Sequence, residues 1–250
     1  MLFDLDIEFL EALNAVDTVA LNLRGNALAQ TITGNAGAND INSGGGAADT
    51  LRGLGGDDFY RVFNAADRVI EAIGQGTADR VVAAVSYALD KFSEIEVLAT
   101  QNNAGIAAIN LTGNDFGQRR VGNAGANVIT GFGGHDTLVG GAGADTFVFF
   151  GDYNPTNTDL ITDYSVAADQ IRFDATDSAI LPVGALAAAA FVTNITGLAQ
   201  DASDRIIYQS NTGKLFFDAD GLGGVAAVQF AQVTPNLGLS NAEFNIFIAT

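Results

Sequence analysis

The stretch from Gly122 to Phe149 reads GNAGANVIT GFGGHDTLV GGAGADTFVF, and the rest of the chain can be read outward from it. It divides into nine-residue units that begin at Gly122, Gly131 and Gly140. The third unit fits the pattern G-G-x-G-x-D-x-U-x at every fixed position, where U is a large apolar residue. The middle unit keeps the aspartate and the apolar residue, and the first unit has Asn127 in place of the aspartate. The repeat predicts a stack of short turns and strands.

Each position of the unit has a physical role. Glycine permits the tight turn formed by the first six residues and lets its carbonyl oxygens face a cation. The aspartate at position six adds a charged oxygen, which is the kind of ligand that calcium prefers. Residues seven to nine form a short strand whose apolar residue points inward. Two units make one coil, so alternate turns stack on one side. We therefore predict an all-β parallel β-roll, or β-solenoid, with calcium between stacked turns.

The same nine-residue repeat occurs earlier in the chain. Units begin at Gly25, Gly34, Gly44 and Gly53, with one extra residue near Ser43, and a degenerate unit begins at Gly113. The predicted same-side pairs at position six are Gln30 with Asp49, Asn39 with Asp58, Gln118 with Asp136, and Asn127 with Asp145. Each pair offers one carboxylate and one amide. Such pairs predict weaker sites than double aspartates, because fewer negative ligands surround each ion.

The predicted calcium ligands combine these side chains with the glycine turns. They are Asp49, Asp58, Asp136, Asp145, Asn39 and Asn127, with Gly44, Gly46, Gly53, Gly55, Gly131, Gly133 and Gly140. After the last repeat, Asp163 and Asp169 are expected to close the final coil and to add ligands for a last ion. The acidic residues Asp67, Glu71 and Asp79 offer further ligands. For these three we favour the simpler interpretation of solvated strand and turn residues, because carboxylates are ordinarily exposed.

A longer repeat organises the chain above the nine-residue units. The sequence from Gly34 to Asn39 recurs unchanged from Gly122 to Asn127, an offset of 122 − 34 = 88 residues. We predict a first β-roll module at 1–62, irregular β linking coils at 63–106, a second module at 107–150, and a C-terminal antiparallel β cap at 151–250. Within the cap, two strand-like runs flank Asn211-Thr212-Gly213, which is a good hairpin turn.

Composition limits the partners. The 250 residues carry 29 acidic and 11 basic side chains, a formal charge of −18. This excludes nucleic acid and anionic membrane surfaces as obvious partners, since both require a basic surface. Such an excess of like charge opposes compaction unless counter-ions neutralise it, and calcium is the natural candidate. There is no cysteine, hence no disulfide framework. We find neither a basic, apolar secretory leader nor a run of about 18 apolar residues that would span a membrane.

Catalytic motifs were sought and not found, so we expect no enzyme activity. His135 is the single histidine, and at position five of a unit it is expected to be an exposed turn residue. A helical metalloprotease motif needs two histidines. The sequence also lacks the G-x-S-x-G elbow of hydrolases and the lysine-containing glycine loop that cradles phosphates.

These repeats make the chain resemble the RTX (repeat-in-toxin) calcium-binding family, most closely over residues 25–61 and 113–149. Residues 144–250 resemble the C-terminal domain of secreted RTX proteins. The resemblance implies Gram-negative origin, type I secretion, and an extracellular or cell-surface location. It also implies that residues 243–248 belong to an uncleaved secretion signal, and that the chain folds on meeting calcium outside the cell.

Three functions remain open at this point. The first is a calcium-dependent structural protein of a surface layer, adhesin or matrix filament, which could associate end to end through open strand edges. The second is the secretion and folding domain of a larger secreted hydrolase, and the natural start of the reading frame would separate these two. The third is an ice- or polysaccharide-binding face, which ranks last because flat, repetitive threonine ladders are absent.

Overall fold

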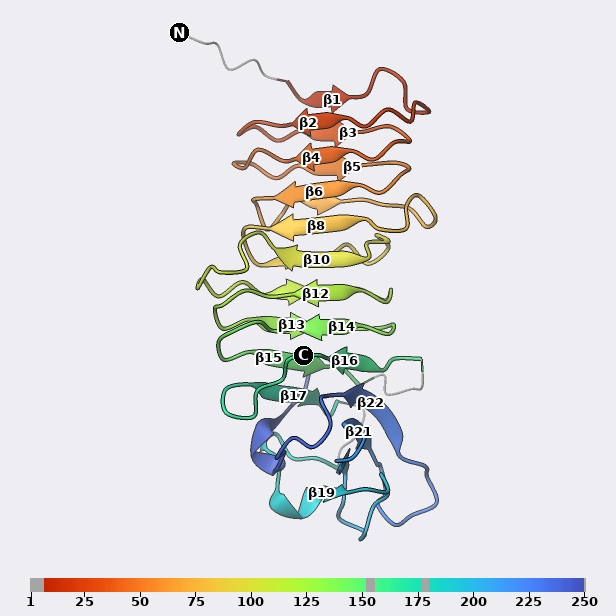
Figure 1. Ribbon diagram of the computed structural model, residues 1–250, viewed down its shortest axis with the longest axis vertical. Coiled ribbons are helices and arrows are strands. Elements are labelled where there is room, and N and C mark those ends of the chain that lie inside the picture. Colours follow the sequence, from red (N-terminus) through yellow and green to blue (C-terminus); the bar gives the residue numbers. More distant parts are fainter. Residues whose placement is uncertain (1–6, 152–155, 177–179, 250) are drawn as a thin grey trace.

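The computed structural model describes residues 7–151, 156–176 and 180–249, and these form an elongated stack of short β-strands. Figure 1 shows the strands piled along the long axis, with the N-terminal coils at one end and the C-terminal strands at the other. Within the described residues, the helical segments are two short 3₁₀ turns, η1 (Ala188–Ala190) and η2 (Asn241–Glu243). The all-β prediction is therefore confirmed.

Three sheets carry the strands. The first sheet contains β1 (Phe9–Glu11), β3 (Thr31–Thr33), β5 (Thr50–Arg52) and β7 (Arg68–Val69). The twelve-stranded sheet contains β2 (Asn22–Arg24), β4 (Asp40–Asn42), β6 (Phe59–Val62), β8 (Arg80–Ala83), β10 (Val97–Thr100), β12 (Arg119–Val121), β14 (Thr137–Val139), β16 (Asp159–Ile161), β22 (Val228–Gln232), β21 (Lys214–Phe217), β20 (Ile206–Gln209) and β19 (Phe191–Asn194). The third sheet contains β9 (Tyr87–Ala88), β11 (Leu111–Thr112), β13 (Val128–Thr130), β15 (Thr146–Phe149), β17 (Gln170–Asp174), β23 (Phe244–Phe247) and β18 (Gly184–Ala185).

Strand register confirms that two nine-residue units make one coil. Thr31 lies beside Thr50 in the parallel pair β3–β5, and Arg119 lies beside Thr137 in β12–β14. Consecutive strands therefore alternate between the two faces of the roll. The apolar residues at position eight point inward, and Ile32, Ile41, Leu51 and Leu138 are 0% exposed. The period of the repeat thus sets both the coil length and the core.

The turns stack in close contact. Gly44 has a φ of 87°, in the left-handed region that glycine tolerates. A Cβ there would lie 2.5 Å from the carbonyl carbon of Gly25 in the preceding coil. Leu54 and Phe132 keep positive φ values of 80° and 66° at the second position of their units, where the pattern prefers glycine. The stack therefore imposes its turn conformation even on side chains that disfavour it.

The linking segment continues the same stack. The pairs β6–β8, β8–β10 and β10–β12 are parallel and join both modules within the twelve-stranded sheet. On the opposite face the described strands divide between β7 and β9, which belong to different sheets. The irregular coils thus preserve one face of the roll and interrupt the other.

The C-terminal residues close the roll with both antiparallel and parallel strand pairs. Ile206 lies beside Phe217 in the hairpin β20–β21, and Gly213 in its turn has a φ of 79°. Strand β22 then pairs in parallel with β16 of the roll. Strand β23, which contains most of the predicted secretion signal, pairs in parallel with β17 and buries Phe244 and Ile246. The cap is continuous with the sheets of the roll.

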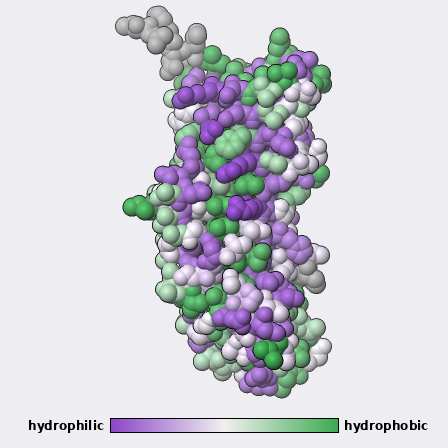
Figure 2. Space-filling model, viewed as in Figure 1, coloured by the Kyte–Doolittle hydropathy of each residue, from purple (hydrophilic) through white to green (hydrophobic). Residues whose placement is uncertain are grey.

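Two apolar clusters fill the interior, one from Ile32 to Leu111 and one from Ile129 to Ile246. Aromatic rings dominate the second cluster, where Phe149 and Phe173 pack against Phe230 and Phe217 packs against Phe173. On the face drawn in Figure 2, hydrophilic residues lie along the whole length of the molecule and are interrupted by hydrophobic ones.

We expect Phe147→Ala to lower the free energy of unfolding by about 3–5 kcal/mol, because it leaves a cavity in the core. Phe147 is 0% exposed and its ring centroid lies 6.0 Å from that of Tyr164. Urea unfolding at fixed calcium concentration would measure the loss. The control is Leu198→Ala, at a side chain that is 65% exposed, and it should change stability little. Equal effects of the two substitutions would contradict this assignment of the core.

Candidate calcium-binding site

The residues at position six form a ladder of hydrogen bonds along each face of the roll, which we call the carboxylate ladder. In each step a carboxylate oxygen accepts the backbone N–H of the residue one coil earlier. The predicted same-side pairs show it at 2.7 Å for Gln30–Asp49, Asn39–Asp58 and Gln118–Asp136 and at 2.8 Å for Asn127–Asp145. The ladder continues through Asp49–Asp67, Asp58–Asp79, Asp79–Glu96, Asp136–Asp159 and Asp145–Asp169, at 2.6–3.1 Å.

The ladder uses one oxygen of each carboxylate and leaves the other facing the turn. Among the described residues, the Oδ2 atoms of Asp49, Asp58 and Asp145 are buried without a hydrogen-bond partner. Their glycines make room for them, since a Cβ on Gly53 or Gly140 would overlap the carboxylate of its own unit. A buried carboxylate oxygen without a partner is costly. A cation ligated by these oxygens would remove that cost, so the turns fit calcium.

Three buried acids gather where the first module meets the linking coils. Carboxylate oxygens of Asp58, Glu71 and Asp79 lie within 4.8 Å of one another. The three side chains are at most 1% exposed, and each keeps one oxygen that no described residue pairs. The Tyr60 hydroxyl donates to the other oxygen of Glu71. The structure therefore contradicts our preference for reading Asp67, Glu71 and Asp79 as solvated residues, because all three are buried.

Burial raises the pKa of these acids. It raises the pKa of Glu71 to about 8, of Asp79 to about 7 and of Asp58 to about 6, with neighbouring carboxylates adding to the effect. Burial also raises the pKa values of Asp49 and Asp145 to about 6. Like charges held close together in a poorly solvated site disfavour ionisation. A divalent cation would favour the ionised forms and so compete with protons for these sites.

The two predicted asparagine ligands differ in their surroundings. Asn39 Nδ2 donates to Asp58 Oδ1 at 2.9 Å, while Asn39 Oδ1 is buried without a partner among described residues. Asn127 Oδ1 accepts the Asn123 N–H at 2.9 Å, and Asn127 Nδ2 donates to the Ile109 carbonyl at 2.7 Å. Asn39 thus has a free acceptor beside the acidic cluster, whereas Asn127 is engaged in holding its own turn.

The predicted glycines fall into three groups. Gly53, Gly131 and Gly140 lie against the carboxylates of their own units, as a cation site requires. Gly44 and Gly46 supply left-handed turns, with φ values of 87° and 94°. A Cβ on Gly55 would lie nearest Ala36, and one on Gly133 would lie nearest Asp115. These two glycines therefore face the adjoining turn.

Asp163 and Asp169 bind backbone groups at the end of the second module. Asp163 accepts the N–H groups of Gly140 and Gly141 at 2.9 and 2.8 Å. Asp169 accepts the N–H of Asp145 at 2.9 Å through Oδ1 and that of Ser165 at 2.8 Å through Oδ2. Both carboxylates therefore stabilise turns directly, and their lone pairs are less available than those of Asp145.

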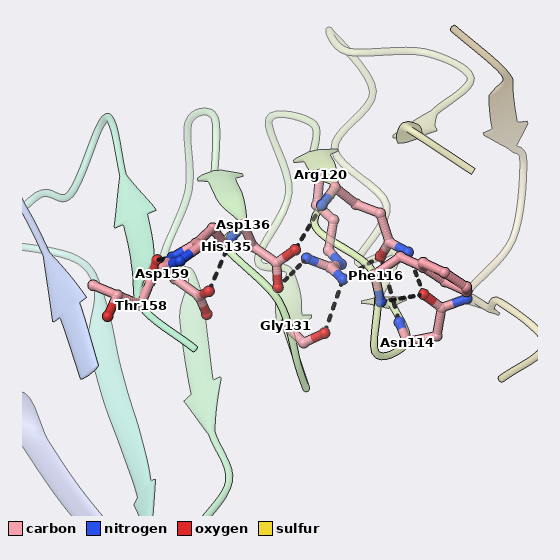
Figure 3. Close-up of polar contacts among 9 residues, drawn as sticks. Asn114, Phe116, Arg120, Gly131, His135, Asp136, Thr158 and Asp159 are labelled. Atoms are coloured by element: carbon pink, nitrogen blue, oxygen red, sulfur yellow. Dashed lines mark hydrogen bonds and ion pairs between the residues drawn. The ribbon is translucent and has the colours of Figure 1, made fainter. Parts of the chain in front are cut away.

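Asp136 departs from the other predicted aspartates because an arginine lies against it (Figure 3). Arg120 Nη1 lies 2.8 Å from Asp136 Oδ2, and both side chains are 0% exposed. Burial raises the pKa of Asp136 to about 6, although the Arg120 charge opposes the rise. Burial and the charge of Asp136 raise the pKa of the next acid, Asp159, to about 8. Asp136 Oδ2, which was predicted to ligate calcium, therefore faces a buried guanidinium.

Sequence reasoning therefore missed Arg120, and it named Glu71 and Asp79 as possible ligands but favoured a solvated role for them. Arg120 had a signal, since it stands at position eight of its unit, where an apolar residue is expected. For Glu71 the sequence offered only its charge, because the residue lies outside the repeat and enters the site through the folding of a linking coil. His135 is exposed and its Nδ1 lies 3.0 Å from the Thr158 carbonyl oxygen, in agreement with its interpretation as a turn residue.

In chelator, the free energy of unfolding should fall as the pH rises from about 5 to about 8. The folded-state pKa values of Glu71 and Asp79 exceed their ordinary values of 4.5 and 3.8, so the folded state holds protons that the unfolded state releases. The stabilisation is complete below the ordinary values and is lost as the pH passes about 7 and 8. Urea unfolding across this range would measure it.

The matched control for this pH dependence is the double variant Glu71→Gln/Asp79→Asn, which should fall less steeply. Saturating calcium should abolish the fall, because the ionised carboxylates then have a partner. A calcium-free stability that rises over the same range would contradict the burial of these acids.

Comparison with known proteins agrees with this geometry. Residues 24–60 match the family model of the RTX calcium-binding nonapeptide repeat (4 copies), and residues 48–233 match that of the peptidase M10 serralysin C-terminal domain. The comparison with curated proteins gives no match. No helix among the described residues is long and apolar enough to cross a membrane. The RTX repeats make calcium binding a family-level property, and the two matches together point to a protein exported by type I secretion. The chain belongs to the serralysin C-terminal family and carries RTX calcium-binding repeats.

Proposed function

We propose that this chain is a non-catalytic extracellular protein whose β-roll is completed by calcium. The observation that carries the proposal is the set of buried carboxylate oxygens without partners at Asp49, Asp58, Glu71, Asp79 and Asp145. Inside a cell, where calcium is scarce, their mutual repulsion opposes folding. Extracellular modules bind calcium with dissociation constants of roughly 10⁻⁴–10⁻³ M, so the ions available outside are sufficient to fill such sites.

The energy available is large enough to control folding. An ion that binds only the folded state, at a hundredfold excess over its dissociation constant, adds about 2.7 kcal/mol. A few such sites together approach the roughly 5–15 kcal/mol by which typical proteins are stable. The best-supported site lies at Asp58, Glu71 and Asp79, with Asn39 beside it. Further sites lie at Asp49 and Asp145.

Asp58→Asn should have opposite effects with and without calcium. Asparagine retains an oxygen that can accept the Asn39 N–H and removes one buried charge. In chelator the variant should be more stable than the wild type. In saturating calcium it should be less stable, by up to about 2–3 kcal/mol, because a charged ligand is lost. Urea unfolding in the two conditions gives both values.

The control for this experiment is Asp115→Asn, whose carboxylate side chain is 64% exposed and pairs with Lys91 at 3.7 Å. It should leave both stabilities nearly unchanged. If Asp58→Asn destabilised the protein equally in chelator and in calcium, the side chain would serve only the fold, and this site would be lost from the proposal.

For the biological role, we favour a structural one in a surface layer, adhesin or matrix filament. What supports it is the N-terminal end of the roll, where β1 and β2 are the terminal strands of their sheets. Apolar side chains are exposed there, with Phe9 at 69%, Leu13 at 105% and Val16 at 79%. Strand edges of this kind favour association with other strands.

The family match supports a second candidate, namely the folding and secretion domain of a larger secreted hydrolase. The matched family model is named for the C-terminal part of a peptidase, and it covers most of the roll and cap.

Light scattering of the folded protein separates the two roles. A structural subunit should form larger species in calcium and dissociate in chelator, and Phe9→Ser/Leu13→Ser should weaken that assembly. A protein that stays monomeric at all calcium concentrations would favour the folding-domain role.

A further inference from the structure

One equivalent position in the interiors of the two modules differs in charge. Arg120 and Ile32 are 120 − 32 = 88 residues apart and occupy position eight of the first unit in each module. The other units carry an apolar or aromatic residue there, namely Ile32, Ile41, Leu51, Tyr60, Ile129, Leu138 and Phe147. Arg120 is nevertheless as buried as these residues, at 0% exposure. A charge in this position requires compensation by the turns around it.

The guanidinium reaches three oxygens of the turns (Figure 3). Nη1 lies 2.8 Å from Asp136 Oδ2, as an ion pair whose angle falls outside hydrogen-bond geometry. Nη2 donates to the Gly131 carbonyl at 2.8 Å and to Gln118 Oε1. A carboxylate, a turn carbonyl and a side-chain amide oxygen make up the ligand set that the repeat presents to calcium. Here that set surrounds a covalently attached cation.

The neighbouring residues are arranged around the guanidinium. Gln118 Nε2 donates to Asn114 Oδ1, so the oxygen of this amide faces Arg120. Asn114 is fixed in turn by donating to the carbonyls of Asp90 and Ser93, each at 2.8 Å. A Cβ on Gly113 would overlap the guanidinium, so glycine is needed there to admit it.

The first module shows the alternative arrangement. Ile32 lies against Gly25 as Arg120 lies against Gly113, with its Cδ1 2.9 Å from where a Cβ on Gly25 would be. Asp49 accepts the Gln30 N–H at 2.7 Å, as Asp136 accepts that of Gln118. No described residue pairs with Asp49 Oδ2, whereas Asp136 Oδ2 faces Arg120. The two modules therefore have the same ladder step, one with a built-in cation and one without.

We propose that the Arg120 guanidinium replaces calcium at the Gln118–Asp136 step, so that this coil is neutralised without metal. The inference rests on the proposed calcium binding elsewhere in the roll. A calcium ion sharing these oxygens would lie within a few ångströms of a buried positive charge, and the repulsion at that distance excludes it. The second module then takes up calcium only at its other steps.

The test counts bound calcium and compares thermal stability in Arg120→Ile and the wild type. The substitution copies Ile32 and frees the Asp136 carboxylate. In saturating calcium the variant should bind one more ion per chain by equilibrium dialysis with elemental analysis. Its melting temperature should drop in chelator and recover most of the loss in calcium. The matched control is Arg120→Lys, which keeps a cation and should bind no additional ion.

The reciprocal variant Ile32→Arg should bind one ion fewer than the wild type, and it decides the matter if Arg120→Ile does not fold in chelator. The inference is overturned if Arg120→Ile binds the same number of ions as a calcium-binding wild type and its melting temperature falls by the same amount in chelator and in calcium. A wild type that binds no calcium would instead overturn the proposed function, so the two failures are distinguishable.

Discussion

The structure depends on how buried carboxylates along the roll are neutralised. One oxygen of each position-six acid accepts a backbone N–H of the preceding coil. This bond sets the spacing between coils and satisfies a turn donor that no β-strand would pair. The same bond draws the second oxygen into a turn lined by glycine, away from water. Stacking and charge burial are thus consequences of one interaction, and the roll cannot have the first without the second. The coils differ in how the charge on this second oxygen is neutralised.

The architecture of the roll could be predicted from the sequence, because a strict repeat period allows few ways of stacking the units. The nine-residue repeat with glycine turns fixed the two-unit coil, the parallel pairing and the partners Asn39–Asp58 and Asn127–Asp145, all of which the register reproduces. The hairpin at Gly213 followed from turn chemistry alone. The linking segment was predicted only as irregular β coils, because it has no period from which contacts between its residues could be derived. The position of Glu71 beside Asp58 and Asp79 depends on how a longer loop folds back onto the coil, and that is set by tertiary contacts that no local pattern encodes.

Arg120 shows a different limit of pattern reading. The pattern identified Gln118 and Asp136 correctly as a same-side pair, and the structure places them as expected. What it left undetermined was the identity of the cation, because the repeat specifies oxygens and not what they bind. The deviation at position eight was visible in the sequence, yet its meaning required knowing that the guanidinium extends to the turn rather than to solvent. A mismatch to a repeat can therefore carry more functional information than a match.

A fixed arginine and an exchangeable metal ion solve the same electrostatic problem with different consequences. An ion contributes stability that depends on its concentration, so coils that rely on calcium respond to the environment. A guanidinium contributes stability at every calcium concentration. Because it is already part of the chain, no free ion has to be immobilised when the coil folds. Placing one such residue at the start of the second module gives that region a coil whose charge is balanced from within, next to coils whose acids are not. If the proposed roles of calcium and Arg120 hold, the order of metal-dependent and metal-independent steps along the roll determines where folding can begin when calcium is low. Coils adjoining Arg120 have a neutral neighbour to pair with, whereas those around Asp58, Glu71 and Asp79 face the largest uncompensated charge and should order last.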